Sequence, residues 1–271
     1  MKIVVITRVR NEQRNIMRYW NAWAPVADLM LFADGGSTDN TIMMAKMLEK
    51  VKIRSFGKCF EIREGVYWNP EGPHSNFLIE WALEERPDWI VYADIDEVPN
   101  YILQHSIRNL LFKTKKHVLW TRMVHFWGTD MIIPELHDIE MTDRRATAWR
   151  PSVVNLWARE DDPIVLELHV NRDIWRGNES LLRYGNLNQI ATHEDQELWL
   201  SLRTKERKFY EELKIYGMKI DFPACILHYG YDDQGIVEEK MKRYGLQKHP
   251  LDAPGLSLSV PDYFMSMEEP K

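Results

Sequence analysis

The chain has 271 residues, with 35 Lys and Arg against 41 Asp and Glu, so its formal net charge is −6. Hydrophobic residues make up 45%, which is ordinary for a folded globule and excludes a disordered chain. No apolar stretch approaches the roughly 20 residues that a membrane-spanning helix needs. The only cysteines, Cys59 and Cys225, are too few for a disulfide framework and indicate a reducing, cytoplasmic compartment. The net negative charge argues against a dedicated nucleic-acid binder, because such proteins usually carry an excess of basic residues.

Strand and helix patterns alternate along the first hundred residues. Lys2 to Val9 is apolar and β-branched, which predicts a buried strand. In the segment that follows, Tyr19 and Trp23 recur at helical spacing, which predicts an amphipathic helix. The same reasoning predicts strands over 2–9, 27–34, 51–56 and 89–94, and helices over 11–24, 42–50 and 76–85. This alternation is typical of an α/β fold with a mostly parallel central sheet flanked by helices.

The second half alternates less regularly. It predicts strands over 116–128, 148–158 and 221–230, and helices over 195–216 and 237–244. Four prolines after residue 249 predict an extended C-terminal tail. Because no linker divides the chain, we expect a single domain over 1–248, with halves 1–100 and 101–248, followed by the tail 249–271.

Polar residues follow three of the predicted strands. Thr7-Arg8-Val9-Arg10-Asn11-Glu12 ends the first strand, Asp34 ends the second, and Asp94-Ile95-Asp96-Glu97 ends the fourth. In an open parallel sheet, ligands bind beyond the carboxyl ends of the strands. Two hard oxygen donors at i and i+2 suit Mg²⁺ or Mn²⁺ held together with substrate phosphates. The alternative interpretation of Asp94 and Asp96 is a solvated acidic turn.

Other polar positions allow both a functional and a structural interpretation. The turn after Asp34 supplies Gly36 for positive φ and helix-capping residues, while a carboxylate at Asp34 could accept the imide N–H of a uracil or bond a ribose. His228 follows an apolar run and is either structural or a further metal ligand. Glu194 and Asp195 begin a predicted helix, where they either complement its dipole or supply a general base. No Gly-x-Gly-x-x-Gly pattern indicates a nicotinamide cofactor.

Three segments in this order resemble a family 2-type glycosyltransferase with the GT-A, Rossmann-like fold. They are Arg10-Asn11-Glu12 with Asn15-Ile16 and Trp20, then 32–41 (FADGGSTDNT), and then 87–97 (PDWIVYADIDE) with its Asp-x-Asp motif. Good similarity covers about the first 100 residues. Beyond them, 193–197 is similar to the family's acid motif and 227–230 to its late metal-binding His.

The resemblance implies transfer of a hexosyl-type sugar from a nucleotide-sugar, with a UDP-sugar first among the candidate donors, to an acceptor hydroxyl by inverting single displacement. It implies a divalent metal, Mn²⁺ or Mg²⁺, held by Asp96 and His228, with Asp94 toward the ribose or the metal. It also implies Asp195 as the catalytic base, with Glu194 second. The remaining donor contacts that it implies are Thr7 and Arg8 by the base and ribose, Asn11 and Glu12 in the same segment, Asp34 on the base, Asp39 bracing the turn, and His74.

Two positions depart from the family pattern. His74 stands where a basic residue usually precedes the helix before the acid pair, and Arg8 stands near the position of the Pro in the family's Pro-x-Tyr-Asn-Glu run. The second departure bears on base selectivity. The 1–100 half would bind the nucleotide-sugar and the 101–248 half the acceptor.

Two other functional classes stay open on the sequence alone. A nucleotidyltransferase could use the same sheet edge and paired acids, although a Gly-rich basic loop after the first strand is missing. A non-catalytic nucleotide- or sugar-binding module would need no base. The acceptor is also open: a saccharide, a lipid-linked sugar, a protein or a modified nucleobase.

Overall fold

The computed structural model describes residues 1–57, 61–63, 66–68, 71–127, 131–132, 144–151, 217–219, 224–231 and 258–259. The predicted helices 195–216 and 237–244 lie outside these ranges, as do most residues of the predicted tail. Within the tail, Leu258–Ser259 (β13) pairs with Met131–Ile132 (β9).

One half of the main sheet is parallel. Its strands are β1 (Ile3–Val9), β2 (Leu29–Asp34), β3 (Val51–Ser55) and β6 (Trp89–Tyr92), in the spatial order β6-β1-β2-β3. Each of the three contacts between neighbours is parallel. All four segments are rich in apolar or β-branched residues, as buried strands of a parallel sheet require.

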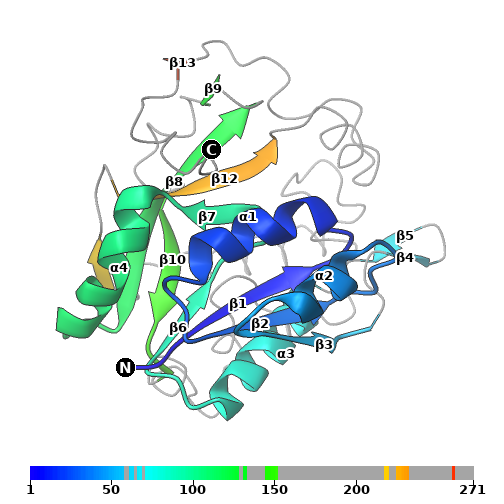
Figure 1. Ribbon diagram of the computed structural model, residues 1–271, viewed down its shortest axis with the longest axis horizontal. Coiled ribbons are helices and arrows are strands. Elements are labelled where there is room, and N and C mark those ends of the chain that lie inside the picture. The colour runs from blue at the N-terminus through cyan, green and yellow to red at the C-terminus, as the bar shows by residue number, and fades with distance from the viewer. Residues whose placement is uncertain are drawn as a thin grey trace, which may run out of the picture.

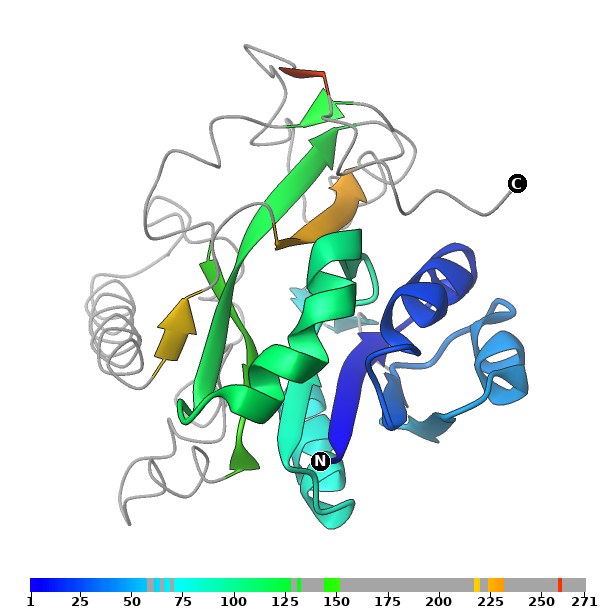
Figure 2. The same cartoon turned by 60° about the vertical axis from the view of Figure 1, so that its left-hand side comes forward.

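The other half of the sheet is mixed. β10 (Arg144–Trp149) lies antiparallel to both β6 and the long β8 (Val118–Trp127). Two strands then pair in parallel with successive halves of β8: β11 (Gly217–Lys219) and β12 (Cys225–Tyr231) (Figure 2). β7 (Glu97–Pro99) lies antiparallel to β12, and a separate hairpin joins β4 (Glu61–Arg63) to β5 (Val66–Trp68).

Helices cover both faces of the sheet. They are α1 (Gln13–Trp23), α2 (Thr41–Met47), α3 (Glu71–Glu84) and α4 (Tyr101–Lys113). α1, α2 and α4 contribute to one apolar cluster, and Figure 1 shows α1 and α4 in front of the sheet. α3 contributes to the cluster on the opposite face, through Leu78, Trp81 and Ala82. Of the helices that the structure describes, none is both long and apolar enough to span a membrane.

These layers confirm the predicted α/β fold class of a central sheet flanked by helices. The first five predicted elements and the strand predicted over 89–94 agree with the structure to within a few residues. Three differ more: α3 begins at Glu71 rather than at residue 76, β10 begins at Arg144 rather than at 148, and α4 was not expected. Pro73 is tolerated in the first turn of α3, because the N–H that it lacks has no partner within the helix there.

α4 carries signals that identify it after the fact. Leu103, Ile107 and Leu111 are buried at a spacing of four residues, which is one face of a helix. The Asn100 side chain caps the helix by accepting a hydrogen bond from the backbone N–H of Leu103 (3.0 Å).

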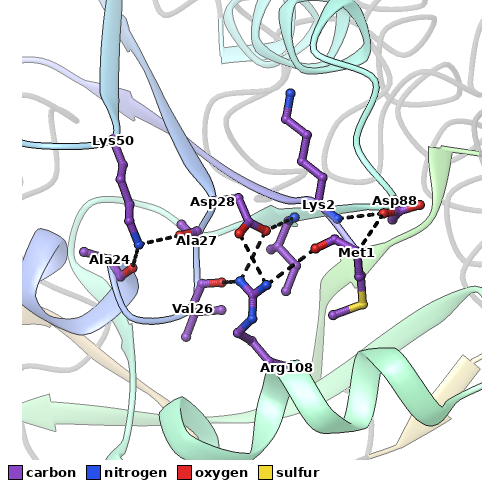
Figure 3. Close-up of polar contacts among 10 residues, drawn as sticks. Met1, Lys2, Ala24, Val26, Ala27, Asp28, Lys50, Asp88 and Arg108 are labelled. Atoms are coloured by element: carbon purple, nitrogen blue, oxygen red, sulfur yellow. Dashed lines mark hydrogen bonds and ion pairs between the residues drawn. The ribbon is translucent and has the colours of Figure 1, made fainter.

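α4 is anchored to the amino ends of the strands by Arg108 (Figure 3). Its guanidinium donates to the Val26 carbonyl (2.6 Å) and pairs with the Asp28 carboxylate (3.2 Å). Asp28 also accepts from the backbone N–H of Ile3 (2.7 Å). Burial raises the pKa of the Asp28 carboxyl, but these hydrogen bonds and the charge of Arg108 outweigh it and lower the pKa overall.

We expect Asp28→Asn to lower the free energy of unfolding by about 1 kcal/mol at neutral pH, because it weakens the hydrogen bonds to Arg108 and to Ile3. The loss is small because Asp28 is partly exposed and solvent screens its charge. A lowered pKa gives stability that is present at neutral pH and lost as the pH falls below about 4. Urea unfolding between pH 3 and pH 7 should therefore show a shallower acid loss in the variant.

Glu84→Gln is the control, because the Glu84 side chain is 60% exposed in its pair with Arg54. It should leave the pH profile unchanged. Equal pH profiles for Asp28→Asn and wild type would contradict the anchoring role.

Candidate functional site

Four strands deliver polar residues to one edge of the sheet. β1, β2 and β6 are parallel, so their carboxyl ends meet at the same edge. β8 is antiparallel to β10, which is antiparallel to β6, so β8 and its parallel partner β12 run in the same direction as β6. Asp34 at the end of β2, Asp94 two residues after β6, and His228 in the middle of β12 therefore lie toward this edge.

The acid pair lies in a closed turn between β6 and β7. Glu97 donates its backbone N–H to the Asp94 carbonyl (2.8 Å), and its carboxylate accepts from the backbone N–H of Asp94 (2.8 Å). The Glu97 side chain is buried. Sequence reasoning gave Glu97 no separate role, although it stands directly after the acid pair, and the structure makes it the residue that closes the turn.

Two aromatic side chains of α1 hold the same turn from the core. The Tyr19 hydroxyl donates to the Ala93 carbonyl (3.0 Å), and the Trp23 indole N–H donates to the Glu97 carbonyl (3.0 Å). Burial raises the pKa of the Tyr19 hydroxyl well above its usual value, so it remains a protonated donor. Thr7 is fully buried beside them, and its hydroxyl donates to the Arg8 carbonyl (3.3 Å).

Asp96 and His228 lie together, as the sequence predicts. Asp96 Oδ2 is 3.6 Å from His228 Nε2, and the two side chains are 17% and 14% exposed. The backbone N–H of Tyr229 donates to the Asp96 carbonyl (2.8 Å), which ties β12 to the acid turn. The other ring nitrogen of His228 lies 2.8 Å from Nδ1 of His125, on β8.

Gly230 leaves room for this pair. A Cβ on Gly230 would lie 2.5 Å from Cε1 and 2.6 Å from Nε2 of His228, and 3.1 Å from Oδ2 of Asp96. Such contacts are far below van der Waals distance, so any other residue would displace the imidazole. The glycine thus leaves a cradle beside Nε2 of His228 and Oδ2 of Asp96.

The donor set of this cradle fits a divalent cation. A carboxylate oxygen and an imidazole nitrogen are both ligands of Mn²⁺, and the carboxylate also suits Mg²⁺. Their separation of 3.6 Å is shorter than two metal–ligand bonds of about 2.1 Å placed end to end. Among the described residues no group of three or more His, Cys, Asp and Glu side chains forms a complete ligand set.

Asp94 lies with Arg8, whose guanidinium nitrogen is 3.2 Å from Asp94 Oδ1. The same guanidinium lies 6.0 Å from the centroid of the Tyr92 ring. The structure therefore gives the two acids of the Asp-x-Asp motif different partners, Arg8 for Asp94 and His228 for Asp96.

His74 is placed differently from the sequence expectation. It lies inside α3 rather than before it, is buried, and stacks on Phe56 with the ring centroids 4.5 Å apart. Its Nε2 contacts the Ala33 carbonyl at 2.9 Å. Burial and the nearby charge of Arg8 lower its pKa to about 3, so it is neutral at physiological pH and cannot replace the basic residue of the family.

Asp34 shapes the turn that follows it. Its carboxylate accepts from the backbone N–H of Gly36 (3.0 Å) and of Ser37 (3.1 Å). Gly36 has a φ of 88°, which other residues rarely adopt. Asp34 is 3% exposed in this arrangement. A role on a nucleotide base stays a prediction, and it would have to coexist with these bonds.

The remaining predicted residues of this edge join the two loops that precede α1 and α2. Asn11 Oδ1 accepts from the backbone N–H of Thr38 (2.7 Å). The backbone N–H of Glu12 donates to the Thr41 hydroxyl (2.7 Å). The Asp39 carboxylate accepts from Thr41 N–H (2.9 Å) and Gln13 N–H (3.2 Å), so one carboxylate caps both helices. Glu194 and Asp195 lie outside the described residues.

No protein-family model matches the chain, and no curated protein sequence does either. Solved structures that match include residues 1–349 of S. aureus TarS, at 14% identity and a TM-score of 0.48, over 92% of this chain and 67% of that one. Glucosyl-3-phosphoglycerate synthase from Mycobacterium tuberculosis, in complex with phosphoglyceric acid, matches at 13% identity and a TM-score of 0.44, over 96% and 87%. The same synthase with Mn²⁺, uridine-diphosphate and glucosyl-3-phosphoglycerate matches at 14% and 0.38, over 91% and 81%. The low identities and TM-scores mark a distant likeness.

We expect Gly230→Ala to displace the His228 ring and to lower the free energy of unfolding by about 1–3 kcal/mol, because the added methyl overpacks the cradle. The test is a double-mutant cycle of urea unfolding with His228→Ala. Removing the imidazole removes the clash, so Gly230→Ala should cost clearly less in the His228→Ala background. Equal costs in both backgrounds would contradict the steric role.

Proposed function

We propose that the chain is a metal-dependent glycosyltransferase that moves a sugar from a nucleotide-sugar to an acceptor hydroxyl. The observation that carries the proposal is the Asp96–His228 pair in the Gly230 cradle, held at the carboxyl edge of the sheet beside the Arg8–Asp94 pair. That edge is where open α/β sheets bind nucleotides. The resemblance of the first hundred residues to family 2-type glycosyltransferases supports the same chemistry.

The donor would lie across the ends of β1, β2 and β6. Asp34 would accept a hydrogen bond from the nucleotide base, and a UDP-sugar is the donor that we put first. Arg8 is 17% exposed and places a positive charge at this edge. It would approach the ribose or the diphosphate, with Asp94 setting its orientation. Asn11, Glu12 and Asp39 would keep the two loops in place around the donor.

Asp96 and His228 would hold the divalent cation. When bound, Mn²⁺ or Mg²⁺ supplies Lewis-acid neutralisation of the charge on the leaving diphosphate. The turn around Asp94 and Asp96 is fixed by Glu97 and by α1, so the ligand atoms need little reorganisation before binding.

Asp195 would act as the general base, with Glu194 as the second candidate. It would take the proton from the acceptor hydroxyl as that oxygen attacks the anomeric carbon and the nucleoside diphosphate leaves. An inverting single displacement needs one such base. The acceptor stays open between a saccharide, a lipid-linked sugar, a protein and a modified nucleobase. An unbiased donor screen that scores released nucleotide is the most informative first experiment.

We expect Asp96→Asn and His228→Ala to abolish sugar transfer and the Mn²⁺-dependent part of UDP binding, because each removes one ligand from the cation. Isothermal titration of UDP with and without Mn²⁺ measures the binding, and UDP release from UDP-sugars measures turnover. Far-ultraviolet circular dichroism should show an intact fold in both variants.

Glu84→Gln is the matched control, since it also removes a carboxylate charge but lies at the far end of α3. Full turnover in EDTA would contradict the proposed metal dependence. Release of pyrophosphate from a nucleoside triphosphate, with no turnover of any nucleotide-sugar, would support a nucleotidyltransferase instead.

We expect Asp34→Asn to weaken UDP binding by about 1–3 kcal/mol while leaving the free energy of unfolding close to that of wild type. The amide oxygen still accepts from the Gly36 and Ser37 N–H groups, but the amide nitrogen cannot accept from a base. Titration with UDP and urea unfolding separate the two effects. An unchanged dissociation constant for UDP would refute the role of Asp34 on the base.

A further inference from the structure

We propose that His125 is a positioning residue that fixes the tautomer of His228 and so directs the Nε2 lone pair of His228 toward the cation site. The inference rests on the proposed metal site. His125 Nδ1 lies 2.8 Å from His228 Nδ1, a distance that only a hydrogen bond between the two nitrogens allows. One of the two nitrogens therefore carries the proton and the other accepts it.

Which of the two Nδ1 atoms carries the proton follows from Nε2, the other nitrogen of the His228 ring. A neutral imidazole has one N–H and one lone pair, so a lone pair at Nε2 requires the proton at Nδ1. Nε2 faces Asp96 at 3.6 Å, across the space that Gly230 leaves. A cation held there needs the Nε2 lone pair, so His228 Nδ1–H donates and His125 Nδ1 accepts.

The sheet sets this contact. His125 and His228 are directly paired in the parallel register of β8 and β12, so both side chains stand on the same face. The next residues, Phe126 and Tyr229, stack with their planes 2° apart and their centroids 4.8 Å apart. Arg18 of α1 covers the Tyr229 ring at 4.2 Å. The strand pairing up to His228 and the aromatic stack directly after it thus hold the histidine pair in place.

A partner on the second nitrogen is a common feature of metal-binding histidines. Such a partner orients the ring and sets its tautomer, and its loss typically lowers metal affinity 10- to 100-fold. The usual partner is a carboxylate, a backbone carbonyl or water, whereas here it is a second imidazole. His125 would therefore influence the site without contacting the cation.

The test compares two variants of nearly equal shape. His125→Asn keeps an acceptor oxygen at the position of Nδ1, and His125→Leu removes it. We expect the dissociation constant for Mn²⁺, measured by titration of the full chain with Mn²⁺ alone, to rise about 10- to 100-fold in His125→Leu and to stay near wild type in His125→Asn. His105→Leu, on the exposed face of α4, is the control and should change nothing.

Nitrogen-15 NMR of the His228 ring gives a readout that a purely structural role would not move. With Zn²⁺ as the diamagnetic probe, the wild type and His125→Asn should show the proton on Nδ1, and His125→Leu should lose this single state. If His125→Leu fails to fold, His125→Gln serves as the loss variant, because its amide lies one carbon too far from the Nδ1 position.

The outcomes separate the two proposals. If Asp96→Asn and His228→Ala weaken Mn²⁺ binding but His125→Leu binds Mn²⁺ like wild type with the same His228 tautomer, the role of His125 is wrong and the metal site stands. If none of the three variants alters Mn²⁺ affinity, the metal site itself is wrong, and the role of His125 is overturned with it.

Discussion

The hydrogen bonds from Tyr19 and Trp23 to the carbonyls of Ala93 and Glu97 hold the turn on which the candidate site depends. A turn at the end of a buried strand has backbone carbonyls that water cannot reach, and leaving them without donors costs about 1–3 kcal/mol each. α1 supplies the donors from the tips of side chains whose rings lie in the core. One amphipathic helix therefore contributes both apolar packing and the shape of the acid turn.

Asn100 extends the same principle to β12. Its side-chain oxygen accepts hydrogen bonds from the backbone N–H groups of Leu103 and Cys225. The backbone N–H of Asn100 donates to the Cys225 carbonyl. Asn100 is fully buried, so one amide begins α4 and fixes the start of β12. From that start, three residues of strand bring His228 level with Glu97 in the antiparallel register of β7 and β12. The position of the imidazole is therefore set by a residue four positions after Asp96.

The sequence predicts what local patterns determine, which here are the parallel strands and the polar residues at their ends. Asp96 and His228 were assigned to one metal site through the resemblance to family 2-type glycosyltransferases, and the common direction of β6 and β12 agrees with placing them at one edge. No local pattern or motif marks His125, because it meets His228 only through a pairing between residues 103 positions apart. The helix over Tyr101–Lys113 was not predicted, and its local signals are the Asn100 cap and the four-residue spacing of its buried side chains.

The two aspartates of the Asp-x-Asp motif have the same carboxylate group but different neighbouring side chains. Two carboxylates in one turn repel each other, and a neighbouring positive charge reduces that repulsion. Arg8 of β1 forms an ion pair with Asp94, and it stands near the position of the Pro in the family pattern. Asp96 lies 3.6 Å from the His228 imidazole, so in the proposed site these two side chains face the cation together. In the proposed function Arg8 therefore orients Asp94 toward the donor, while Asp96 turns to His228 and the cation, because each carboxylate is held by a partner from a different strand.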